Sequence, residues 1–208
     1  GPGVAGHEVK RRSGFQVVYG PVEAEEIPLF LEKGLKAKER MRRKDFGFME
    51  RLALVPMEVV PAVRLGLPVA AGLFALCFLL GGLSLSRALE CFAVPAGAIG
   101  TSILAGTVLT PVLLPWLPGR AFSVKGLVTG ILSALLLIPL VRGSGVLETA
   151  FLLVSIPAMS AYLAMNFTGS STFTSLSGVK KEMRFALPLE IGGVGAGLLM
   201  WIIALLGG

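Results

Sequence analysis

Residues 65–83 read LGLPVAAGLFALCFLLGGL, nineteen consecutive positions without a charged side chain. The hydrocarbon core of a bilayer is about 30 Å thick, and a helix needs about 20 apolar residues to cross it. The whole chain of 208 residues is 54% hydrophobic and 15% charged, with a mean hydropathy of +0.79. Because soluble domains are much less apolar, this composition is typical of membrane proteins, and residues 65–83 predict a transmembrane helix.

Four further apolar stretches follow the first one. They cover residues 91–117, 124–141, 146–165 and 185–206. We therefore expect a mainly α-helical membrane protein in which residues 65–208 form about five transmembrane helices.

Prolines, threonines and glycines inside these stretches predict how the helices bend and pack. Pro95 and Pro111 predict kinks in the second stretch, and Thr107 and Thr110 are placed to bond the carbonyl groups that a kink frees. The last stretch carries glycines at positions 192, 193, 195 and 197. Such small residues permit close contact between two helices in a membrane.

Lysine and arginine are distributed unevenly along the chain. Twelve precede the first predicted span, and the loops between spans two and three and between spans four and five add Arg120, Lys125, Lys180, Lys181 and Arg184. Only Arg87 and Arg142 fall in the alternate loops. The positive-inside rule then predicts a protein of the cytoplasmic (inner) membrane with its N-terminus in the cytoplasm and its C-terminus outside. Since topology explains these basic groups, we expect membrane lipid, and not nucleic acid, as a partner.

Two acidic residues lie within or at the end of the apolar stretches. Glu148 is near the outer end of the fourth stretch, and Glu190 lies about a turn and a half into the fifth. An ionisable residue inside a membrane is a functional candidate. The simpler interpretation, which we favour, is that Glu148 reaches the interface and that Glu190 pairs with Arg184 near the cytoplasmic interface.

The two cysteines, Cys77 and Cys91, lie in or beside apolar stretches, with no CxxC motif and no histidine pairing nearby. We predict that both are small, buried hydrophobic side chains, and that they form neither a disulfide nor a metal site. The sequence accordingly predicts no catalytic and no metal-binding residue.

Residues 1–64 form a polar segment ahead of the apolar one. Their patterns predict a helix, a strand and a second helix at residues 4–12, 15–19 and 23–33, and Gly14 ends the first helix. This order predicts that residues 1–35 are the C-terminal end of an α/β domain. Because so short a segment cannot bury a core, we expect the N-terminal part of that domain to be missing. The basic run and the apolar residues of 36–64 predict a linker and an interfacial helix.

Three stretches carry a resemblance to a known family. They are residues 2–31, which include PGVA and SGFQVVYGP, residues 104–123, LAGTVLTPVLLPWLPGRAFS, and residues 164–184, which include AMNFTG and FTSLSGVKKEMR. The first stretch resembles the C-terminal end of the corrinoid-binding domain in the large subunit of the corrinoid iron–sulfur protein of acetyl-CoA synthesis. Together the three stretches resemble the membrane-anchored corrinoid proteins of microbial mercury methylation.

That family joins a Rossmann-like corrinoid-binding domain to a five-helix membrane domain. The resemblance implies a corrinoid-dependent methyltransferase that carries a methyl group on the cobalt of a cobalamin-type corrinoid and transfers it to Hg(II). It also implies a ferredoxin-like iron–sulfur protein as the reductant partner. The positions whose backbone is implied to approach the corrinoid are Pro2, Gly3, Val4, Ala5, Gly20 and Pro21.

The sequence departs from the family in one respect. The family's Asn-Val/Ile-Trp-Cys-Ala-Ala/Gly-Gly-Lys motif, whose cysteine is taken to ligate cobalt from below, is absent. We therefore expect an N-terminally truncated fragment that is inactive by itself. The alternatives are a membrane-bound corrinoid methyltransferase with another acceptor, a membrane transporter subunit, and a membrane anchor without an activity of its own.

Overall fold

The computed structural model describes residues 5–42, 47–140, 145–167 and 176–207. The chain divides into two compact units, Gly1–Gly47 and Phe48–Gly208. Within the four described ranges every regular element is a helix, and no strand is present.

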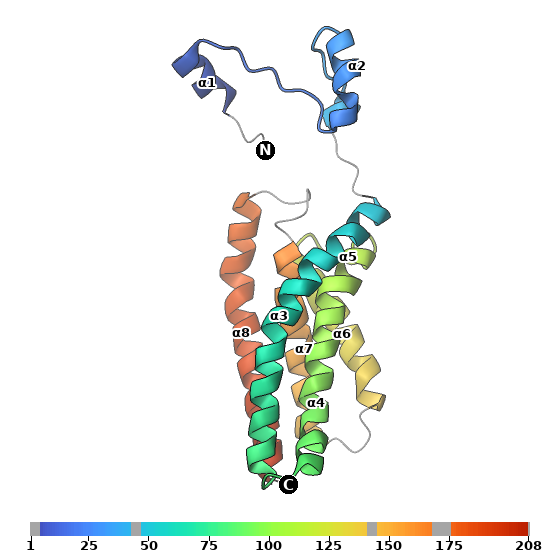
Figure 1. The fold of residues 1–208 in the computed structure, drawn as a ribbon, viewed down its shortest axis with the longest axis vertical. Coiled ribbons are helices and arrows are strands. Elements are labelled where there is room, and N and C mark those ends of the chain that lie inside the picture. The colour runs from blue at the N-terminus through green and yellow to red at the C-terminus, as the bar shows by residue number, and fades with distance from the viewer. Residues whose placement is uncertain (1–4, 43–46, 141–144, 168–175, 208) are drawn as a thin grey trace. The chain divides into compact units, whose positions relative to one another are not determined.

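The second unit is a bundle of long helices. Its elements are α3 (Phe48–Leu80), α4 (Leu85–Ile103), the π-helical segment η3 (Leu104–Leu109), α5 (Thr110–Leu113), α6 (Phe122–Leu137), η4 (Ile138–Leu140), α7 (Val146–Asn166) and α8 (Leu176–Gly207). Figure 1 shows that the long helices lie side by side and that their direction alternates along the chain. The beginning of α3 and the C-terminus therefore lie at opposite ends of this bundle.

Four segments are long and apolar enough to cross a membrane. They are Phe48–Leu80, Leu85–Leu113, Val146–Asn166 and Lys180–Gly207. Four of the predicted spans thus correspond to helices of membrane-spanning length, which indicates a membrane protein. The remaining one, predicted over residues 124–141, corresponds to α6, which is apolar but has 16 residues. At 1.5 Å per residue its length is about 24 Å, shorter than a bilayer core of about 30 Å.

Helix α3 corrects the predicted structure ahead of the first span. The sequence predicts a linker and a separate interfacial helix over residues 36–64, whereas α3 runs without a break from Phe48 to Leu80. Arg51, Glu58 and Arg64 give this part of the sequence an interfacial character, but charged side chains do not interrupt helical backbone hydrogen bonds. The first apolar stretch is therefore the second half of one long helix.

Helix α7 is the centre of the bundle, because it packs against α4, α6 and α8. Its side chains Phe151, Leu152 and Ile156 are buried and join Trp201 of α8 in the main hydrophobic cluster. Helix α3 differs, since only 6% of its most apolar window is buried inside the protein. A helix with so much outward apolar surface is suited to face lipid.

The first unit contains α1 (Gly6–Ser13), η1 (Ala24–Glu26), α2 (Ile27–Glu32) and η2 (Glu39–Arg42). The predicted first helix is confirmed, and Gly14 ends it with a φ of 75°, a left-handed conformation that glycine adopts without strain. The strand predicted at residues 15–19 is wrong, because these residues form no strand. A strand needs a neighbour for its backbone hydrogen bonds, and the described part of this unit provides none.

Candidate functional site

Helices α6 and α7 approach each other closely because two glycines face the contact. A Cβ on Gly126 would lie 2.6 Å from the Ser160 carbonyl oxygen, and a Cβ on Gly130 would lie 2.6 Å from the Cα of Pro157. The Ser160 hydroxyl donates a 2.8 Å hydrogen bond to the Gly126 carbonyl oxygen. Small residues and interhelical hydrogen bonds are common means of helix association in membranes. We refer to these four residues as the α6–α7 seam.

Buried threonines connect this seam to the π-helical segment. The hydroxyls of Thr107 and Thr110 donate to the carbonyl oxygens of Ile103 and Ala105 at 2.7 and 2.8 Å. The missing N–H of Pro111 frees neither of these carbonyls, since the backbone N–H of Thr110 also bonds Ala105, so the bonds are local ones and not the expected repair of a proline kink. The Oγ1 atoms of Thr110 and Thr129 lie 2.7 Å apart and share a hydrogen bond between helices. Since each of these hydroxyls has a partner, the cluster stabilises packing and offers no unused polar group to a ligand.

Glu190 of α8 lies in a different environment. Its side chain is 5% exposed, and neither of its carboxylate oxygens has a hydrogen-bond partner. It lines a cavity of about 240 Å³ together with Met159, Tyr162, Ile191 and Val194. It also lines a second cavity, of about 270 Å³, between α6, α7 and α8. Burial, the missing partner and the adjoining space make Glu190 the candidate functional residue of the bundle.

The predicted ion pair between Glu190 and Arg184 is wrong. Arg184 is exposed and stands six residues earlier on α8, about 240° away around the helix axis. The two side chains therefore point in different directions. Nearer the start of α8, Glu182 is engaged elsewhere, since its Oε1 atom accepts a 2.6 Å hydrogen bond from the backbone N–H of Ser123 at the start of α6.

Glu148 has a structural role at the start of α7. Its Oε2 atom accepts a 3.2 Å hydrogen bond from the backbone N–H of Gly145, the residue that precedes the helix. A carboxylate in the first turn also interacts favourably with the helix dipole. The expected placement of Glu148 near the helix end is confirmed, and capping explains it without a functional role.

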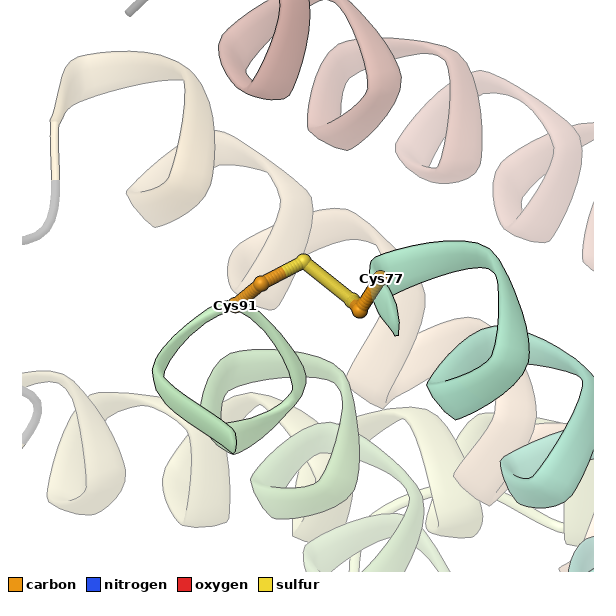
Figure 2. Close-up of a disulfide and its surroundings, with 2 residues drawn as sticks. All are labelled: Cys77 and Cys91. Carbon is orange, nitrogen blue, oxygen red and sulfur yellow. A yellow bond between two sulfur atoms is a disulfide. The ribbon is translucent and has the colours of Figure 1, made fainter. Parts of the chain in front are cut away.

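Cys77 and Cys91 form a disulfide, which corrects the prediction that they form none. The predicted burial is confirmed for Cys77, which has no exposed surface. Figure 2 shows Cys77 on α3 joined to Cys91 on α4. Gly82, with a φ of 68°, belongs to the tight turn between these helices. The turn folds α4 back along α3 and brings the two Cα atoms within 5.8 Å, a separation that suits a disulfide. Both cysteines of the chain are used, so neither is a free thiol.

The positions implied to contact a corrinoid are only partly described. Pro2, Gly3 and Val4 lie outside the described residues. Ala5 is exposed and precedes α1, and Gly20 is exposed beside the buried Phe30. The backbone N–H of Gly6 donates a 2.9 Å hydrogen bond to the Tyr19 hydroxyl. Gly6 follows Ala5, and Tyr19 precedes Gly20 and Pro21. The bond therefore brings the implied contact position Ala5 near the implied contact positions Gly20 and Pro21.

Comparisons with known proteins add no assignment. No protein-family model, no curated protein and no solved structure matches the chain. Among the described residues, no group of three or more His, Cys, Asp or Glu side chains is placed to hold a metal ion. The class that the fold defines is therefore a helical membrane protein, and Glu190 is its candidate site.

Proposed function

We propose that this chain is the membrane part, and the end of the corrinoid-binding domain, of a longer protein that methylates Hg(II). In that protein the methyl group would come from a corrinoid cobalt, and a ferredoxin-like iron–sulfur protein would restore the low-valent metal. The support is the resemblance of residues 2–31, 104–123 and 164–184 to one family. The observation that carries it furthest is their distribution, because the first stretch belongs to the first compact unit and the other two belong to the second.

A five-span topology is part of the same proposal. Helix α6 and η4 together span residues Phe122–Leu140, and a short apolar helix can cross where the bilayer thins or flanking side chains reach outward. Lys125 lies near the start of α6, where a long side chain can reach the interface, and its Nζ donates a 2.7 Å hydrogen bond to the Leu114 carbonyl oxygen. An odd number of crossings puts residues 1–47 and the C-terminus on opposite sides of the membrane. The distribution of basic residues then favours residues 1–47 on the cytoplasmic side.

The described residues do not make a complete corrinoid site. The disulfide occupies both cysteines, and His7 is exposed on α1. No metal-binding group occurs in the described ranges. In this proposal the cobalt ligand and the steps of methyl transfer belong to the rest of the longer protein, and no step is placed on residues of this chain. The proposed task of this chain is to hold the corrinoid domain at the cytoplasmic membrane surface.

The test is to express this chain with its upstream sequence and its iron–sulfur partner. We expect the absorbance spectrum of a bound corrinoid and the formation of methylmercury from Hg(II). Replacing the cysteine of the upstream Asn-Trp-Cys-Ala type motif by alanine should abolish methylation. An upstream region without an α/β domain would contradict the proposal. A protein that binds a corrinoid but methylates another acceptor would support the related methyltransferase instead.

A membrane transporter subunit is the second candidate, and Glu190 is the observation that favours it. Acidic residues buried in a membrane often mark ion pathways. Against this, the other acids of α7 and α8 whose contacts are described, Glu148 and Glu182, are engaged with helix starts. Proton or solute flux through vesicles that contain the purified chain, abolished by Glu190→Gln, would favour the transporter.

A further inference from the structure

We propose that the carboxyl group of Glu190 is a membrane-embedded proton-binding site in the wall between α7 and α8. This site is independent of the corrinoid chemistry proposed above. It rests on the packing around one side chain of the bundle, and its test requires no corrinoid, no mercury and no upstream sequence.

Glu190 is a buried acid without a partner. Glu190 is 5% exposed, and both of its oxygens lack a hydrogen bond. An ionised carboxylate without a partner in an apolar environment is costly, and within a bilayer no bulk water compensates for the loss. Binding a proton removes the charge. The neutral acid is the form of Glu190 that this environment accepts.

A bound metal ion could also neutralise the charge of Glu190, but the lining of the cavities is poorly suited to one. Calcium takes six to eight oxygen ligands, and magnesium needs six in near-octahedral geometry. Of the residues that line the two cavities beside Glu190, Tyr162 alone brings a further side-chain oxygen. The remaining lining residues are apolar or glycine. This oxygen-poor lining favours a proton over a metal ion.

The ionisable groups on the helices around Glu190 are exposed or bonded to other atoms. On α6, the Lys125 ammonium bonds the Leu114 carbonyl oxygen. On α8, Glu182 accepts from the Ser123 N–H, while Lys180, Lys181 and Arg184 are exposed. On α7, Glu148 bonds Gly145 at the start of the helix, which leaves Tyr162 as the ionisable group at the cavity. No described cation is therefore placed to pair with Glu190.

The cavity beside Glu190 gives the carboxyl group access to apolar reagents. Met159 and Tyr162, which line the first cavity, also line a third one of about 120 Å³ against α3 and α4. Met159 and Tyr162 thus form a wall shared by the cavity beside Glu190 and the one against α3 and α4. The cavity beside Glu190 is open to the outside of the bundle rather than enclosed. A small apolar reagent dissolved in the membrane can therefore reach the carboxyl group, whereas a charged, water-soluble reagent is excluded from the hydrocarbon.

The test is carbodiimide labelling of the 208-residue chain in phosphatidylcholine vesicles. Dicyclohexylcarbodiimide dissolves in the membrane and reacts with a protonated carboxyl group. The carboxyl proton passes to a carbodiimide nitrogen and the carboxyl oxygen bonds to the central carbon, and the adduct then rearranges to a stable N-acylurea without losing an atom. Peptide mass spectrometry locates the adduct on the wild-type protein. The result therefore does not depend on a variant that must fold.

We expect the adduct on Glu190, with a yield that falls as the pH is raised, and no adduct on Glu190→Gln. The control is Glu25 of η1, which is exposed and should react with a water-soluble carbodiimide and not with the apolar one. Equal labelling of Glu190 by both reagents would overturn the proposal, because it would show a hydrated carboxylate. Absence of the adduct at every pH, or protection by sodium relative to choline at constant pH, would also overturn it.

Discussion

The α6–α7 seam and the contact between α7 and α8 show two ways of packing against the same central helix. In the seam, Gly126 and Gly130 bring backbone against backbone, and the Ser160 hydroxyl bonds across the contact. The α7–α8 contact also uses glycine, since a Cβ on Gly193 would lie 3.0 Å from the Cβ of Ala158. It nevertheless leaves two cavities and an unpartnered acid.

The two contacts differ in whether stability alone explains their residues. A contact that is filled, and in which every described hydroxyl has a partner, is explained by stability alone. A contact that leaves space beside a buried, unpartnered Glu190 is costly for stability, so a role for that residue is the better explanation. The following predictions test this contrast, beginning with the largest expected effect.

Gly126→Leu should destabilise the bundle most. Its side chain would have to displace the backbone of α7, and overpacking of this kind costs about 3 kcal/mol or more. The matched control is Gly195→Leu on α8, where no atom lies within 4 Å of a Cβ. We expect the control to change the free energy of unfolding by less than about 0.5 kcal/mol. Unfolding by sodium dodecyl sulfate in mixed micelles measures the free energy of unfolding of both variants. An equal loss of stability in the two variants would contradict close packing in the α6–α7 seam.

Replacing Cys77 and Cys91 by serine should weaken the attachment of α3. The disulfide closes a loop with a sequence separation of 14 residues, and the loss of such a link costs about 2 kcal/mol. Because α3 is the least buried of the spanning helices, we expect proteolysis and hydrogen exchange to increase in α3 before α6 and α7. Reduction of the wild-type protein should reproduce the effect. No change in either case would show that the disulfide does not support the bundle.

Glu190→Met should stabilise the bundle, unlike the two changes above. It replaces an unpartnered acid by an apolar side chain of similar length, and removing such a group is worth about 1–3 kcal/mol. The control is Glu182→Met, which removes the acceptor of the Ser123 N–H and should lower stability. If Glu190→Met destabilises the protein as much as the control does, Glu190 has a structural partner.

Thr129→Val should have the smallest effect. It removes the hydrogen bond between Thr129 and Thr110, and interhelical hydrogen bonds in membranes contribute about 0.6 kcal/mol on average. A double-mutant cycle with Thr110→Val isolates this contribution from the effect of shape. A coupling energy of zero would show that the two hydroxyls do not interact.

The sequence predicts the long helices well, because each needs an uninterrupted apolar stretch. The hydroxyls of Thr107 and Thr110 were expected to bond a carbonyl that proline leaves free, but they bond the carbonyls of Ile103 and Ala105, which Pro111 does not free. The glycines were predicted less well. Of the four in α8, Gly193 and Gly197 contact α7, whereas Gly192 and Gly195 have nothing within 4 Å. The small-xxx-small spacing of Gly126 and Gly130 is a signal that identifies the seam from sequence.

The disulfide and the environment of Glu190 required three-dimensional information. Cys77 and Cys91 belong to different helices, and their pairing depends on how the turn at Gly82 sets one helix against the other. Helical periodicity alone argues against the Glu190–Arg184 pair, because six residues place the side chains on different faces. The cavities beside Glu190 arise from the packing of three helices, which no local pattern encodes.

The number of membrane crossings tests the central claim of a cytoplasmic first unit attached to a five-helix bundle. The measurement is the side on which a reporter fused after Gly208 is found, compared with a reporter fused before Gly1. If α6 crosses, the two reporters lie on opposite sides, with the one before Gly1 in the cytoplasm. If α6 stays on one side, only the four longer helices cross and both reporters lie on the same side, which would contradict the account.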